Sequence, residues 1–110
     1  MLIQRIWGQP NNTNKVKPIG FMVADFVKDM DNCVSIGLSI CHETDKFDKV
    51  KGRKMAEERV QFYRVPYQLK NRYNCRMIDE TVWVQFIQFV DRCNRYYRNS
   101  MVILPKVRLV

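Results

Sequence analysis

The middle of the chain carries a cluster of basic side chains around a single glycine. Six residues there are candidates for binding a ligand, namely Phe47, Lys49, Lys51, Gly52, Arg53 and Arg59. Apolar spacing predicts that a helix begins at Arg53, and the free N–H groups at a helix start favour an anion. Glycine lets the backbone approach a phosphate closely, and arginine offers it a planar pair of donors. The cluster predicts a phosphate site, with a capped surface helix whose cations pair with neighbouring acids as the alternative.

Basic and aromatic residues are interleaved further along, where no acidic residue occurs between Arg59 and Asp79. The candidates for nucleic-acid contact in this stretch are Arg64, Tyr67, Lys70, Arg72, Tyr73 and Arg76. Cations follow a phosphate backbone while aromatic faces stack on bases, so the mixture is typical of a nucleic-acid or nucleotide surface. The alternative is that the rings belong to the core and the cations to a solvated face.

The same chemistry recurs near the end of the longest predicted helix. Arg92, Arg95 and Arg98 stand three residues apart and share a helix face. Tyr96 and Tyr97 lie among them. These residues could extend one electropositive surface or form a dimer interface. Cations also complement the dipole at the end of a helix, so the arrangement needs no binding function.

Residue types that support catalysis or metal binding are few. His42 is the single histidine, and its neighbour Cys41 would point to the opposite face of a strand. The four cysteines include no Cys-x-x-Cys pair of the kind that a zinc site uses. The acids of the 45–58 stretch sit among lysines and are typical of surface charge. We therefore expect no catalytic residue, no metal and no cofactor.

Alternating apolar residues predict the strands that must position these groups. Three segments of this kind are Leu2–Trp7, Ile19–Val27 and Val34–Cys41. The second is apolar on both faces, which indicates a central strand. The third is branched and apolar on one face and small on the other, where it carries Ser35, Gly37 and Ser39. Something must approach the small face closely, and the candidates are a packed helix, a second chain or a ligand.

Helical spacing predicts a short helix over Arg53–Val60 and a long one over Glu80–Arg98. Asp79 is placed to cap the long helix. Its apolar stripe consists of Val82, Phe86, Phe89, Val90 and Cys93. Pro105 indicates an edge position or a break in the extended segment Met101–Val110. We expect one α+β domain over 1–110, with a small antiparallel sheet, the long helix packed on it and the shorter helix after the Gly-Arg motif.

Composition limits the partners. The chain has 110 residues, of which 46% are hydrophobic and 27% charged, as is typical of a globular protein. Nineteen Lys and Arg residues against eleven Asp and Glu give a net charge of +8, and a field of that sign favours polyanions. No apolar run approaches the ~20 residues that a bilayer span needs. We expect a cytoplasmic protein with a nucleotide or nucleic acid as its partner and no membrane partner.

A longer pattern joins the glycine cluster to the strand before it. Between Val34 and Arg59 the chain has Asp-x-Phe-x4-Gly-Arg-x2-Ala-x2-Arg after a strand that contains serine and cysteine. This pattern covers about a quarter of the chain and resembles one in small uncharacterised proteins of tailed bacteriophages. The resemblance implies a viral source and the host cytoplasm. Small phage proteins often inhibit host defence by binding, commonly as homo-oligomers.

Together these features predict a non-enzymatic accessory or counter-defence protein that binds a phosphate-bearing ligand. The first alternative is an inhibitor that binds an acidic host target, such as a defence protein. The second alternative is a small enzyme that processes nucleotides or nucleic acid.

Overall fold

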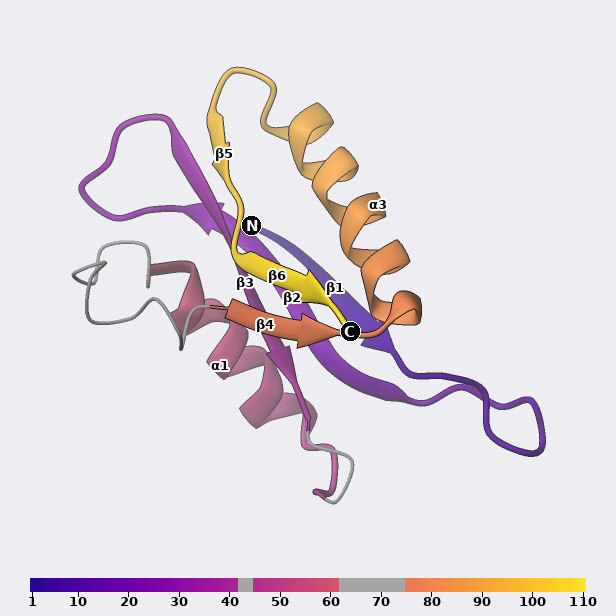
Figure 1. Ribbon diagram of the computed structural model, residues 1–110. Helices are drawn as coiled ribbons and strands as arrows, with labels where there is room; N and C mark the ends of the chain where they lie inside the picture. The colour runs from indigo at the N-terminus through magenta and orange to yellow at the C-terminus, as the bar shows by residue number, and fades with distance from the viewer. Residues whose placement is uncertain (42–44, 62–74) are drawn as a thin grey trace.

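A sheet separates two helices that lie on its opposite faces (Figure 1). The computed structural model describes residues 1–41, 45–61 and 75–110, with the backbone alone for Cys75 and Arg76. The strand order is β1-β2-β3-β5. These strands are β1 Leu2–Trp7, β2 Pro18–Phe26, β3 Cys33–Ile40 and β5 Met101–Ile103. The first three pair antiparallel and agree with the predicted segments to within one residue at each end.

Helix α3, Glu80–Tyr96, covers one face of the sheet, and helix α1, Lys49–Val60, covers the other. The alternation along β2 sends Met22 and Ala24 into the cluster under α3 and Phe21 and Val23 into the cluster under α1. The expectation that β2 is a central strand covered on both sides is confirmed. The α+β class is confirmed as well.

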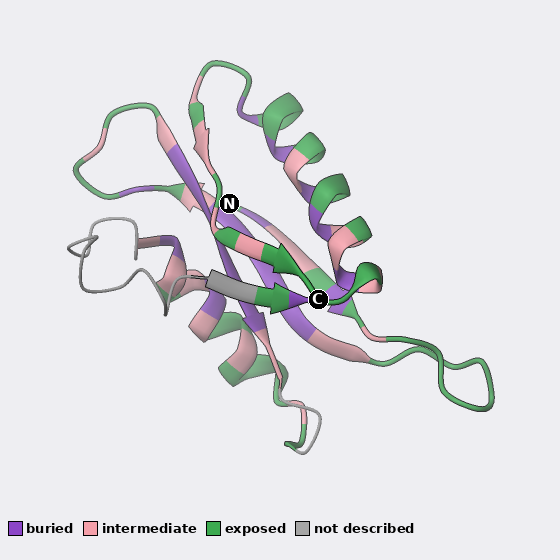
Figure 2. Ribbon diagram, in the orientation of Figure 1, coloured by how far each residue is buried: buried purple, intermediate pink, exposed green. Residues whose placement is uncertain are grey.

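The α3 side holds the larger part of the core. Asp79 caps the helix as predicted, because its side chain accepts the N–H of Val82 at 2.9 Å. Val82, Phe86 and Phe89 lie on the buried stripe of the helix. Figure 2 shows that stripe turned toward the sheet while the outer side of α3 is exposed. Among the described residues no helix is both long and apolar enough to cross a membrane.

The C-terminal segment pairs differently from the prediction. Strand β5 runs parallel to β3, so the expected antiparallel pairing is wrong for this segment. Parallel neighbours need a long crossover connection, and the chain between β3 and β5 supplies one that includes both helices. The break expected at Pro105 is confirmed, because β6, Lys106–Leu109, leaves the main sheet and pairs parallel with β4, Cys75–Ile78.

Candidate functional site

The start of α1 is already capped by a side chain of the protein itself. The helix begins at Lys49, four residues before the predicted start. The carboxylate of Asp48 accepts the N–H groups of Val50 at 3.0 Å and Lys51 at 3.1 Å. It occupies the position that a bound anion would take. The expectation of a helix start with free N–H groups beside Gly52 is therefore wrong.

Gly52 lies within α1 and faces the sheet. A Cβ atom added to it would lie 3.4 Å from Phe21 Cδ2 and 3.7 Å from Phe47 Cε1. Its carbonyl oxygen accepts a hydrogen bond from Ser39 Oγ at 2.6 Å. The ring of Phe47 stacks on Phe21 with their centroids 5.9 Å apart. Both Gly52 and Phe47 thus contribute to the packing of α1 on the sheet.

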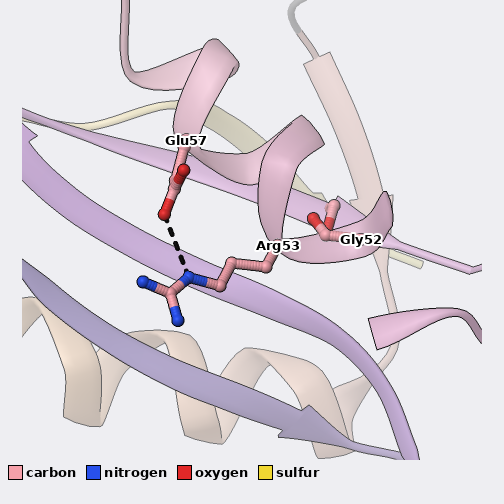
Figure 3. Close-up of polar contacts among 4 residues, drawn as sticks. Gly52, Arg53 and Glu57 are labelled. Atoms are coloured by element: carbon pink, nitrogen blue, oxygen red, sulfur yellow. Dashed lines mark hydrogen bonds and ion pairs between the residues drawn. The ribbon is translucent and has the colours of Figure 1, made fainter. Parts of the chain in front are cut away.

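The basic side chains in the first half of α1 are exposed. Arg53 donates from Nε to Glu57 Oε1 at 3.0 Å, one turn further along the helix (Figure 3). Lys49 and Lys51 are exposed in the first turn. A phosphate contact by Lys49, Lys51 or Arg53 stays a prediction. The alternative was a surface helix whose cations pair with neighbouring acids, and the ion pair between Arg53 and Glu57 is of that kind.

Arg59 and the small face of β3 hold α1 close to the sheet. Arg59 donates from Nη1 to the carbonyl oxygen of Leu38 at 2.6 Å. A Cβ atom on Gly37 would overlap the carbonyl oxygen of Ala56, which leaves no room for any other residue type. Of the three candidates for the object that approaches this face, the packed helix is confirmed.

The second predicted site lies outside the described residues. Arg64, Tyr67, Lys70, Arg72 and Tyr73 fall in the 62–74 segment. Arg76 belongs to β4, where the backbone alone is described. Nucleic-acid contact by these residues stays a prediction.

Part of the third basic group lies around an open, nearly flat depression on the surface. Arg92, Arg95 and Tyr96 line a shallow, open depression on the C-terminal half of α3, which we call the α3 hollow. Arg92 Nη1 lies 3.5 Å from the neutral Gln4 Oε1. Arg95 pairs with Asp91 at 3.2 Å, with their side chains 75% and 68% exposed. An ion pair so open to water contributes little to stability and opens at little cost.

Tyr97 belongs to the core and connects two exposed rings. Its hydroxyl donates to the carbonyl oxygen of Ala24 at 3.2 Å. Burial raises the pKa of this phenol, and the nearby carboxylate of Asp25 raises it further. Its ring meets Phe26 edge-on at 5.4 Å and Tyr96 at 4.8 Å between centroids. Phe26, at 50% exposure, was missed by the sequence analysis, because strand alternation does not show where helix coverage ends.

Two of the cysteine thiols in the described chain take part in packing or hydrogen bonding. Cys93 lies on the buried stripe of α3, and desolvation raises the pKa of its thiol to about 11. Cys41 donates from Sγ to the carbonyl oxygen of Asp45 at 3.4 Å. Within residues 1–41, 45–61 and 75–110 no three His, Cys, Asp or Glu side chains are grouped so that they could hold a metal ion.

Comparison of the chain with protein-family models, curated proteins and solved structures gives no match. The resemblance to small phage proteins therefore stays a prediction, and so does the viral source that it implies.

Proposed function

We propose that the protein binds a phosphate-bearing ligand, a nucleotide or a nucleic acid, through the α3 hollow and without catalysing a reaction. The observation that carries the proposal is the grouping of two exposed arginine side chains with an exposed phenol ring in the α3 hollow. A guanidinium group matches the geometry of a phosphate with two parallel hydrogen bonds. An exposed ring beside it offers a face to a base.

The partners of the two arginines favour this assignment. Arg92 contacts a neutral amide, so its charge is not compensated there. Arg95 shares an ion pair whose two side chains are mostly in water, and a phosphate can displace Asp91 from it. The net charge of +8 adds a long-range attraction for polyanions.

The basic side of α1 offers less to a ligand. The carboxylate of Asp48 accepts hydrogen bonds from N–H groups in the first turn of α1, and Glu57 pairs with Arg53. Gly52, Phe47 and Arg59 are engaged in packing against the sheet. An anion that approaches the first-turn N–H groups of α1 would have to displace the Asp48 carboxylate that caps the helix.

The wider role that fits such a protein is that of a phage-type accessory or counter-defence protein in the host cytoplasm, acting as a homo-oligomer. In the first alternative, the same basic surface binds an acidic host protein in place of a nucleic acid.

A binding assay with charge-matched variants tests the proposal. The probe is a short fluorescent single-stranded oligonucleotide, followed by anisotropy at two salt concentrations. The double variant Arg92→Ala/Arg95→Ala should weaken binding by about ten- to a hundredfold, because each substitution removes a charge-assisted hydrogen bond to a phosphate. The salt dependence should become shallower by about 0.7 in log–log slope for each phosphate that the variant no longer neutralises.

The control is Lys49→Ala/Lys51→Ala, which removes the same charge from α1 and should change affinity only slightly. A larger loss of affinity in the control than in the α3 variant would move the site to α1. A parent protein that does not bind the probe, yet binds an acidic protein surface, would favour the inhibitor hypothesis.

A further inference from the structure

Two exposed aromatic rings flank the buried ring of Tyr97. Phe26 is 50% exposed and Tyr96 is 62% exposed. Each ring contacts the ring of Tyr97 edge-on, with centroid distances of 5.4 Å for Phe26 and 4.8 Å for Tyr96. The centroids of the two outer rings can therefore lie no further apart than the sum of these two distances. Phe26 has the same parity on β2 as Met22 and Ala24, which places it on the α3 face of the sheet. Phe26 therefore lies on the face of the sheet that α3 covers, and Tyr96 is the last residue of that helix.

Hydrogen bonds fix Phe26 and the residue that follows Tyr96. The hydroxyl of Tyr97 donates to Ala24 O, and its backbone N–H caps the end of α3 by donating to Cys93 O at 2.8 Å. Phe26 ends β2, and its carbonyl oxygen accepts a hydrogen bond from Gln61 Nε2 at 3.2 Å. Ligand-binding groups that project from regular elements are positioned better than groups on loops.

Charged groups of both signs lie around the rings. Tyr96 is itself part of the α3 hollow, so Arg92 and Arg95 lie directly beside it. Acids near the rings include Asp91, which is paired with Arg95, and Asp25, which lies close to Tyr97. A ligand that contacts both the arginines and the exposed rings is expected to carry a phosphate group together with a flat apolar face.

We infer that Phe26 and Tyr96 form a stacking platform for unpaired bases, which makes single-stranded nucleic acid the ligand of this surface. The inference rests on the proposed function and extends it from the phosphate to the base. Bases of a single strand present open faces to aromatic side chains, whereas the bases of a duplex are stacked on one another. The arginines contact the phosphates that connect the stacked bases.

The experiment compares three probes of equal length: a single-stranded oligonucleotide, an abasic strand with the same phosphates, and a duplex. The parent should bind the single-stranded oligonucleotide about a hundredfold more tightly than the abasic strand, since two bases stack and each contributes roughly one order of magnitude in affinity. Tyr96→Ala and Phe26→Ala should each remove about tenfold of the affinity for the base-bearing strand and leave the abasic affinity unchanged. Tyr96→Phe, which keeps the ring, should bind like the parent.

The outcomes separate the two proposals. If the parent binds the abasic strand or the duplex as tightly as the single strand, the stacking platform is overturned while phosphate binding stands. If Tyr96→Ala lowers the affinity for the base-bearing strand and the abasic strand equally, the ring only positions the neighbouring arginines, and the inference fails. Because Tyr96 is largely exposed, this variant should fold like the parent, as a thermal melt will check. If neither strand binds, the inference fails together with the nucleic-acid form of the proposed function.

Discussion

The two helices are attached to the sheet by different physical means. Beneath α3, thirteen buried residues of the described chain form one apolar cluster that includes Phe86 and Phe89. Beneath α1, the corresponding cluster has four buried residues, among them Ala56 and Val60. There the helix backbone comes close to β3 at Gly37, and polar groups of the two elements bond directly.

This difference bears on function. The attachment of α1 uses Gly52 and Arg59, two residues whose types also suit a phosphate site. The attachment of α3 uses its apolar stripe, so the arginines on its outer side play no part in the core. A residue type that suits a ligand is therefore weak evidence of a site until its packing role is known.

The largest expected effect concerns the α3 core. Phe89→Ala removes a fully buried ring and should lower the free energy of unfolding by about 3–5 kcal/mol. Phe21→Ala, the same change in the four-residue cluster under α1, should cost less, about 2–3 kcal/mol, because fewer buried neighbours surround that ring. Chemical denaturation of both variants measures the difference. Equal losses of stability would mean that the two clusters contribute alike and that the comparison is wrong.

Gly37→Ala tests the close approach of α1. The added methyl group would collide with the Ala56 carbonyl and force the helix away from β3, at a cost of about 2–3 kcal/mol. Loss of amide protection in α1 by hydrogen exchange, with α3 still protected, is the expected pattern. An unchanged melting temperature would show that α1 does not lie against β3 in this way.

Because the Cys93 thiol is buried, we expect the protein to lose stability at alkaline pH. Its folded pKa is about 11 against an ordinary value of 9.0, because burial disfavours the thiolate. Between these values the unfolded chain has lost the proton that the folded chain keeps, so stability is full below pH 9 and falls by about 2 kcal/mol as the pH rises to 11. Denaturation across this range should show a smaller slope for Cys93→Ala. Identical slopes would contradict the burial of the thiol.

The smallest effect separates packing from binding at Gly52. Alanine fits beside Phe21 and Phe47 at ordinary contact distances and favours a helix, so Gly52→Ala should stabilise the fold by about 0.5–1 kcal/mol. Oligonucleotide affinity should not change. A stabilised variant that no longer binds would restore the predicted phosphate site around this glycine.

Local patterns predicted most of the described fold. The alternation of β3 and the stripe of α3 are strong because each element buries one continuous apolar face. The start of α1 was misplaced because its apolar residues are few, although Asp48 is a residue type that caps helices. Strand β4 and the parallel pairing of β5 could not be predicted, because both depend on how a long connection returns across the sheet.

The candidate site was predictable only in part. Arg92, Arg95 and Tyr96 follow from helical spacing, which places them on or near one face. Tyr97 is buried and Tyr96 is exposed because of where β2 lies relative to the end of α3. Local sequence patterns carry no information about that position. The partnership of Phe26 with these residues is a tertiary contact between the end of a strand and the end of a helix.

Titration of the ¹⁵N-labelled protein with a single-stranded oligonucleotide, followed by NMR, tests the central claim most directly. The account predicts that the amide signals of Arg92, Arg95 and Tyr96 shift first, together with the amide of Phe26, while those of the 49–53 turn stay in place. Shifts confined to Lys49, Lys51 and Arg53, with the end of α3 unaffected, would contradict it and return the ligand to α1.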